Sequence, residues 1–519
     1  MEKPILEAFL LSPHLEGFHL ASWKGLAAAA ALVLVVIPVV RALWSAVYNV
    51  FFHPLRRYPG PFLWIAFPWT KNLALIRGKA DHAIVALHER LGPVVRITPD
   101  TLSFTTMTAW RDIYGTGHAE LPKHIYKGSG MEERPNIITA NSRDHHRFRR
   151  ALMPAFTNDA LGRQEPLITG YTDLLIKRLR EIATSTNSTA DISKWYTMTT
   201  FDIFGDLAYG ESFNALETGK VHPWIKALGD MKFLVPLMVF PGISWLLIPL
   251  LTTTEQRESL SQHQQRSMAL TYKRIKNKEV QERGDIMTFV LREHGEDQGL
   301  SDFEMACNAD IIISAGSETT GTAMTGITYY LLRNPDKLEK CVNEIRGAFG
   351  SQESINFKDT NYKLPYLMAC IEEGLRLYPP VPTALLRETL PGRPTLIDGN
   401  LIPEKTVVAV HHLSTYHSEN NFHDAKNFRP ERWLPEVHSD PSSPFYNDNR
   451  NCLKPFSYGP RNCIGRNLAY HEMRLILSKV LWNFDLALKP GFENWVVGQK
   501  TYQLWAKPSL LVDVKVRSA

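Results

Sequence analysis

The chain has few cysteines and almost no excess charge of either sign. Its five cysteines are an odd number without paired spacing, which fits a reducing compartment and argues against a disulfide scaffold. The net charge of +5 over 519 residues is not gathered into a basic stripe, so nucleic acid is not expected as a partner. The sequence also lacks internal repeats and low-complexity segments, which argues against solenoid and disordered classes.

Extended segments are scarce as well. Clear ones occur at residues 94–97, 407–410 and 510–514, whereas helical periods cover much of the remaining chain. With 44% hydrophobic residues, the chain is large enough to enclose a cofactor in one domain. We therefore predict a mainly α fold with minor β sheets and no domain boundary within residues 49–519.

The most informative segment lies near the C-terminus and precedes a predicted amphipathic helix. It reads Phe456-Ser-Tyr-Gly459-Pro-Arg461-Asn-Cys463-Ile464-Gly465. A cysteine at a helix N-terminus faces backbone N–H groups and the positive end of the helix dipole, and both favour the thiolate. Glycines let the backbone approach a flat macrocycle, and an aromatic ring can shield the sulfur. Such a thiolate suits a haem iron, whereas the structural alternative is a buried cysteine after a turn.

This segment resembles the haem-binding signature of the cytochrome P450 superfamily. The resemblance implies the cytochrome P450 fold, with a single large haem domain. It also implies heme b, whose iron takes the Cys463 thiolate as its axial ligand. Phe456, Gly459, Ile464 and Gly465 would then lie against the cofactor, and Arg461 would reach a haem propionate.

A second informative segment belongs to a long apolar stretch. Residues 302–332 begin at a capping box and stop before a proline, which predicts one long helix. Gly316 weakens the middle of this helix, and we expect local unwinding there. By the resemblance, the helix crosses the distal face of the haem, where Thr319 holds dioxygen with its water and Glu318 feeds protons. The structural alternative is a buried helix with a glycine kink.

Two charged segments resemble a structural network of the same family. Glu373 and Arg376 stand three residues apart on one predicted helix face, and Arg432 follows in a loop rich in asparagine, proline and histidine. The resemblance implies that these three residues form a buried network, which fixes the loop that presents Cys463. The alternative for the helical pair alone is a solvated surface contact.

Basic residues outside the cysteine segment are further candidates for cofactor contact. Arg149 has the family's spacing for a propionate-binding arginine, and His145 occupies the position where the family commonly has tryptophan. Arg387 is another candidate for the propionates. The structural alternative for residues 145–150 is a solvated helix face.

An apolar run covers residues 25–40 and lies between Trp23 and Trp44. As a helix, the stretch between these tryptophans would measure about 31 Å, close to the thickness of a bilayer core. More basic residues follow the run than precede it, which predicts a single-pass anchor with the main domain on the cytosolic side. The resemblance to the cytochrome P450 superfamily implies the endoplasmic reticulum membrane. Residues 1–48 would form the anchor, with its span at about 23–44, and 49–519 the haem-thiolate monooxygenase domain. The alternative is a cleaved signal peptide.

Partners are suggested by charge and by apolar character. A basic face around the thiolate would suit an acidic electron donor, the alternative being an ordinary surface mixture; its predicted members are Lys454, Arg461, Arg466, Arg474 and Lys479. No flavin or nicotinamide domain follows the cysteine segment, so we expect a separate NADPH-dependent flavoprotein reductase. Residues 381–386 and 501–502 are expected to contact a lipophilic substrate. An apolar, proline-interrupted stretch at 233–251 would form a roof for substrate entry or, alternatively, pack in the core.

The segments at 48–61 and 467–477 resemble fungal microsomal members of the superfamily. The predicted function is therefore a monooxygenase that uses O2 and NADPH-derived electrons. It would hydroxylate, epoxidise or further oxidise a lipophilic secondary metabolite, such as a terpenoid, polyketide or alkaloid. A haem-thiolate isomerase or dehydratase that needs no O2 is an alternative, against which the Glu318–Thr319 pair argues. A non-catalytic haem-binding carrier is another.

Overall fold

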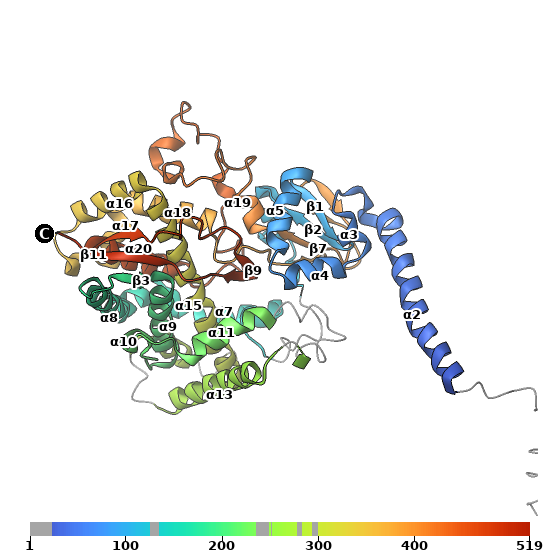
Figure 1. Ribbon diagram of the computed structural model, residues 1–519, viewed down its shortest axis with the longest axis horizontal. Coiled ribbons are helices and arrows are strands. Elements are labelled where there is room, and N and C mark those ends of the chain that lie inside the picture. The colour runs from blue at the N-terminus through green and yellow to red at the C-terminus, as the bar shows by residue number, and fades with distance from the viewer. Residues whose placement is uncertain are drawn as a thin grey trace, which may run out of the picture.

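The computed structural model describes residues 23–124, 134–234, 249–250, 252–277, 283–292 and 299–518. Figure 1 shows a broad, mostly helical body with a sheet-rich part at one end, from which the first helix projects. The helices are α2 (Trp23–Val47), α3 (Phe62–Ala66), α4 (Trp69–Ile76), α5 (Ala80–Leu91), α6 (Met107–Tyr114), α7 (Ser142–Leu152), α8 (Asn158–Ala183), α9 (Ile192–Tyr209), α10 (Ala215–Thr218), α11 (Pro223–Leu234), α13 (Thr254–Lys276), α14 (Ile286–Arg292), α15 (Asp302–Arg333), α16 (Pro335–Ala348), α17 (Phe357–Tyr362), α18 (Pro365–Leu377), α19 (His412–Tyr416) and α20 (Arg466–Asn483). The predicted fold class, mainly α with minor sheets, is confirmed.

The strands are short and form small sheets. They are β1 (Val94–Thr98), β2 (Thr101–Phe104), β3 (Thr189–Asp191), β4 (Arg387–Glu388), β5 (Thr395–Ile397), β6 (Asn400–Ile402), β7 (Val407–Val410), β8 (Phe484–Leu488), β9 (Lys500–Tyr502), β10 (Leu504–Ala506) and β11 (Leu511–Val516). The largest described sheet has the order β1-β2-β7-β4, and its β2 and β7 pair in parallel, with Leu102 opposite Val408. This pairing joins parts of the chain that are 300 residues apart in sequence.

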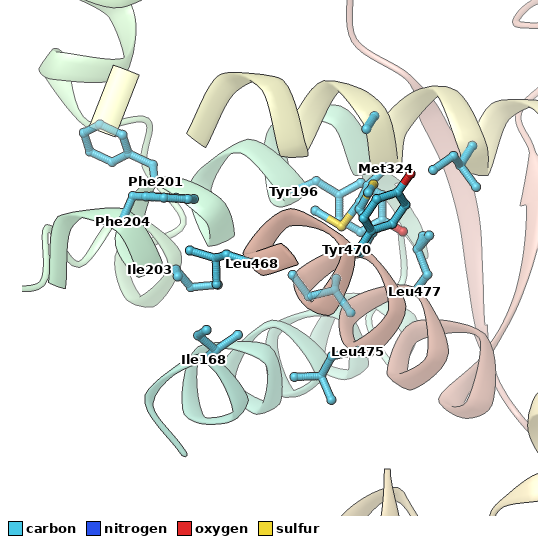
Figure 2. Close-up of a cluster of buried hydrophobic side chains, with 14 of the residues drawn as sticks. Ile168, Tyr196, Phe201, Ile203, Phe204, Met324, Leu468, Tyr470, Leu475 and Leu477 are labelled. Atoms are coloured by element: carbon cyan, nitrogen blue, oxygen red, sulfur yellow. The ribbon is translucent and has the colours of Figure 1, made fainter. Parts of the chain in front are cut away.

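Helix α15 organises the helical part. Its start is confirmed, because the Ser301 side chain and Glu304 form the predicted capping box. It packs against α9, and α20 packs against both α8 and α15. Figure 2 shows apolar side chains of these four helices meeting, among them Ile168, Phe204, Met324 and Leu475. The contact buries the apolar surface that drives the assembly of these helices.

The expected unwinding at Gly316 is wrong, since α15 remains α-helical along its whole length. The glycine has a packing role instead. A Cβ at residue 316 would lie 2.3 Å from the ring of Phe204, which is only 5% exposed. The missing side chain thus allows α9 and α15 to approach closely.

The first helix joins the sheet-rich part through a rigid connection. Helix α2 continues as a π-helix over Tyr48–Phe52, beyond the expected end of the span at residue 44. The buried Arg96 guanidinium of β1 donates to the Asn49 carbonyl at 2.9 Å, and its backbone N–H donates to the Pro59 carbonyl at 2.8 Å. Gly60 is required here, because a Cβ would lie 2.0 Å from the Arg96 carbonyl oxygen.

Other expectations have a mixed outcome. All five cysteines are free thiols, which agrees with the absence of a disulfide scaffold. Among the described residues, α2 is the one helix long and apolar enough to cross a membrane, with an apolar window at Val35–Phe52. The expected roof at 233–251 lies largely outside the described residues.

Replacing Gly316 by alanine should destabilise the protein. The helix propensity gained is about 1 kcal/mol, but overpacking against Phe204 costs about 1–3 kcal/mol, so the free energy of unfolding should fall. Thermal unfolding of Gly316→Ala and Gly347→Ala compares a crowded with an open site, since nothing lies within 4 Å of a Cβ at residue 347. Gly347→Ala should be neutral or slightly stabilising; equal melting temperatures would contradict the packing argument.

Candidate functional site: the cysteine loop and its surroundings

The loop before α20 places Cys463 at an accessible position. Cys463 is exposed, whereas the other four cysteines are buried. Gly459 has φ +76°, and a Cβ there would lie 1.7 Å from the Tyr114 carbonyl oxygen, so only glycine fits. Gly465 is the N-cap residue of α20, and a Cβ on it would lie 4.0 Å from the Cys463 sulfur. Gly459 therefore keeps the loop close to α6, whereas a Cβ on Gly465 would make only an ordinary contact with the sulfur.

The electrostatic surroundings of the thiol differ from the simple expectation. Burial among protein atoms raises the pKa of Cys463, while the Gly465 N–H and the charges of Arg149 and Arg466 act to lower it. Coordination of a metal ion deprotonates a thiol, so a bound iron would act in the same direction as the Gly465 N–H and the two arginines.

The other members of the predicted segment surround the sulfur. The Phe456 ring is half-buried and packs on Tyr470 at 5.0 Å between centroids, and its carbonyl accepts the Cys463 N–H at 2.9 Å. Ile464 packs against the main core. Arg149 donates two hydrogen bonds of 2.7 Å to Asn462, one to its carbonyl and one to its side chain. The structure thus places Arg149 beside the loop that carries the thiol.

A cationic cluster lies beside this loop. Its members are Lys123, His145, Arg149, Arg387 and Arg461. Burial and the charges of Arg387 and Arg461 lower the pKa of Lys123 to about 7. Burial and three of the same cations lower the pKa of His145 to about 3, so this imidazole is neutral at neutral pH. Glu120, which is ion-paired with Arg461, is the one carboxylate among the described residues that acts on the cluster.

The donor set therefore fits a haem. The cluster has an excess of positive charge that two propionate groups would neutralise, and Cys463 presents an accessible sulfur. On α15, Ala315 is exposed although buried residues flank it along the helix, so a small side chain faces open space there. These features agree with the predicted grouping of cysteine, arginines and the central part of α15.

Helix α15 contributes the two predicted catalytic side chains. The Thr319 hydroxyl is half-buried and donates to the Ala315 carbonyl at 2.5 Å. The Glu318 carboxylate accepts from the Lys507 ammonium at 2.7 Å, and this ammonium also donates to the Thr322 hydroxyl at 2.8 Å. Glu318 is thus held in a nearly buried ion pair, which the sequence analysis did not anticipate.

A fully buried charge network lies behind the cysteine loop. Arg376 donates to both carboxylate oxygens of Glu373, at 2.8 and 2.9 Å, and Arg432 contacts the same carboxylate at 3.2 Å. All three side chains are 0% exposed. Trp433 also donates to Glu373, at 2.9 Å, and Asp448 pairs with Arg432. Two carboxylates therefore balance two guanidinium groups.

The expected basic face around the thiolate is partly wrong. Lys479 is 1% exposed and pairs with Asp173, and Arg474 is 6% exposed within α20. Arg461 also points inward, toward Glu120. Long basic side chains can bury their aliphatic parts, so nearness to Cys463 in sequence does not place them on the surface. Lys454 and Arg466 remain at least partly exposed.

Comparisons with known proteins identify the family of the chain. A family model described as Cytochrome P450 matches residues 58–511. The chain belongs to the cytochrome P450 family. The cytochrome P450 monooxygenase dtxS2 of Metarhizium robertsii is 62% identical over 502 residues, which cover 97% of each chain.

More distant relatives of this cytochrome P450 also match over nearly their whole length. Trichothecene C-4 hydroxylase of Trichoderma arundinaceum is 44% identical over 476 residues, covering 91% of this chain and 94% of the relative. The monooxygenase olcB of Penicillium canescens is 41% identical over 477 residues, covering 91% and 96%. The protein is thus a cytochrome P450 monooxygenase similar to fungal enzymes of secondary metabolism, and its family implies a haem-thiolate iron.

Several residues of the site carried no usable sequence signal. Glu120, Lys123 and Asp448 lie in irregular segments, and Lys507 follows a short strand. Each is a common charged residue that is placed in the site by contacts distant in sequence. The sequence alone therefore does not show that these residues belong to the site.

The buried network should be far more sensitive to substitution than a neighbouring exposed ion pair. Arg432→Met leaves Glu373 and Asp448 with unbalanced buried charge, and we expect a loss of about 3–5 kcal/mol in unfolding free energy. Arg429→Met is the matched control, because Arg429 pairs with Asp424 at a side chain that is 41% exposed. Its loss should be about 0–1 kcal/mol. Chemical unfolding of the two variants measures the difference, and similar losses would contradict the assigned role.

Proposed function

We propose that this protein is a haem-thiolate monooxygenase that oxidises a lipophilic small molecule of fungal secondary metabolism. The observation that carries this proposal is the accessible Cys463 thiol at the start of α20. It lies beside a cationic cluster whose positive charge exceeds the negative charge of its one described carboxylate, Glu120. Relatives that include a trichothecene hydroxylase support a substrate of the terpenoid, polyketide or alkaloid kind. Hydroxylation, epoxidation and further oxidation all belong to this reaction class.

In this proposal, the Cys463 thiolate would hold the iron of heme b, and His145, Arg149, Arg387 and Arg461 would bind its propionates. Bound haem supplies the activation of dioxygen and the oxidation of the substrate. The Gly465 N–H donates to the sulfur and tempers its charge, while Phe456 and Ile464 limit access of water. Gly459 lets the cysteine loop lie against the Tyr114 carbonyl of α6.

The proposed proton path uses groups on α15. The Thr319 hydroxyl now donates to the Ala315 carbonyl, and it can release this bond to orient a water molecule or dioxygen. The Glu318 carboxylate takes a proton at Oε1, where the Lys507 ammonium is its donor, and passes it toward Thr319. Lys507, whose side chain is 7% exposed, would regain its proton through this small exposed surface.

We further propose that α2 anchors the protein in the endoplasmic reticulum membrane with the catalytic domain in the cytosol. The support is the exposed apolar surface of α2, where Val35 is 63% and Trp44 is 75% exposed. An NADPH-dependent flavoprotein reductase would deliver electrons, and Lys454 and Arg466 are the candidates for its contact among the residues predicted from the sequence.

The iron ligand is tested by the visible spectrum of the dithionite-reduced, carbon-monoxide-bound protein. A strongly red-shifted Soret band is expected, and Cys463→Ser should abolish it. Cys452→Ser is the control, because Cys452 is buried elsewhere in the loop and should keep the band. A band of the histidine type in the unmodified protein would overturn the proposal.

The role of Thr319 is tested by coupling. With reductase and NADPH, Thr319→Ala should divert electrons to peroxide and lower the ratio of product to NADPH by about 10-fold or more. Thr325→Ala removes a buried hydroxyl that donates to the Gly321 carbonyl within the same helix, and it should leave the ratio unchanged. Equal coupling in both variants would remove Thr319 from the proton path.

A further inference from the structure

A buried polar cluster lies outside the haem site, where α5 meets the segment after β7. Asp81 stands in the first turn of α5 and is 3% exposed, and His411 precedes α19 and is 1% exposed. His411 Nε2 lies 3.0 Å from Asp81 Oδ1. Neither residue belongs to the haem signature or to the charge network around Glu373.

Both ring nitrogens of His411 have partners. The Ser414 backbone N–H donates to His411 Nδ1 at 3.2 Å, and the Ser414 hydroxyl lies 2.7 Å from the same nitrogen. Nε2 faces Asp81 Oδ1, and a hydrogen bond to a carboxylate is stronger than one between neutral groups. The contact therefore holds the imidazole and the carboxylate together in the core.

The Asp81 carboxylate is held in its ionised form. Burial acts to raise its pKa, but the His411 hydrogen bond and the hydroxyls of Thr501 and Thr383 outweigh burial, and the pKa is lowered. Asp81 Oδ2 and Thr501 Oγ1 have no partner of normal hydrogen-bond geometry among the described residues. Thr501 therefore faces the carboxylate at a looser contact than His411 does.

The Asp81–His411 pair stands between two segments that are distant in sequence, residues 381–386 and 499–503. On one side, His411 forms a backbone bridge with Ala384, and the Leu413 N–H donates to the Pro382 carbonyl at 3.0 Å. His412 Nδ1 also lies 3.0 Å from the Val381 carbonyl. The segment 381–386 is thus attached to His411 and the start of α19.

On the other side, β9 is attached to the start of α5. The Thr501 N–H donates to the Gly78 carbonyl at 3.0 Å, and His82 Nε2 lies 2.9 Å from the Gln499 carbonyl. The Asp81–His411 contact connects the two attachments. Each attached segment also presents an exposed side chain, namely Leu385 in the first and Gln503 in the second.

We infer that Asp81 and His411 are positioning residues that set the spacing between segments 381–386 and 499–503, and thereby the shape of the substrate space. The inference rests on the proposed function and on the expectation that residues 381–386 and 501–502 contact the substrate. Because the linking bond is buried and directional, its loss allows the two segments to move independently. Substrate affinity then falls, while the haem and its ligand are unaffected.

The test compares two identical substitutions of buried histidines. His411→Leu removes the link, whereas His88→Leu removes a buried hydrogen bond of 2.8 Å to Ser103 from the far half of the same helix. Amide hydrogen exchange of the full-length haem protein should accelerate roughly 10-fold in both 381–386 and 499–503 for His411→Leu. In His88→Leu, faster exchange should stay near α5 and β2. Acceleration in one segment alone, or in neither, would overturn the inference.

A binding measurement gives a second, independent readout. Clotrimazole, a bulky lipophilic azole, should bind His411→Leu at least several-fold more weakly than His88→Leu, and equal dissociation constants would overturn the inference. Should His411→Leu fail to fold, Asp81→Asn weakens the same bond without a change in volume and should reproduce both effects in smaller measure. The carbon-monoxide band separates the two proposals: its absence from the unmodified protein refutes the haem-thiolate function, whereas the exchange result still decides the positioning role.

Discussion

The buried carboxylate of Glu373 joins helix α18 to the irregular segment that contains Arg432. It lies at 0% exposure and binds two guanidinium groups, one from its own helix α18 and one from the loop that leads to the cysteine. Arg376 in addition donates to the carbonyls of Tyr416 and Ala425. An irregular loop has no ladder of its own hydrogen bonds, so these buried charges replace one. The irregular segments around Tyr416, Ala425 and Arg432 are therefore held to α18 by buried charged groups.

Close backbone approach is the second requirement of the site. Gly459 lets the cysteine loop contact α6, and Gly316 lets α15 pack against Phe204 of α9. Both glycines lie next to residues assigned to chemistry, and each removes a side chain where the protein needs two backbones or a backbone and a ring to touch. Conformational freedom matters at Gly459, whereas at Gly316 only volume matters.

Sequence patterns predicted those parts of the protein that are encoded locally. The capping box at Ser301 marked the start of α15, and apolar runs marked β1, β7 and β11. Local patterns failed where distant contacts decide. They could not show that Lys507 holds Glu318, or that Lys479 turns inward toward Asp173, because both depend on segments brought together only by the fold. The unwinding expected at Gly316 failed because tertiary packing outweighs helix propensity.

The joint between α2 and the sheet has a mechanical consequence. Arg96 fastens the π-helical end of α2 to β1, and Gly60 brings the following segment against the same residue. Because these contacts are buried, we expect α2 and the sheet to keep a fixed orientation relative to each other. If a bilayer fixes the tilt of α2, it then also fixes the orientation of the sheet relative to the membrane. The buried guanidinium of Arg96 thereby helps to set the angle at which the catalytic domain faces other proteins on the membrane.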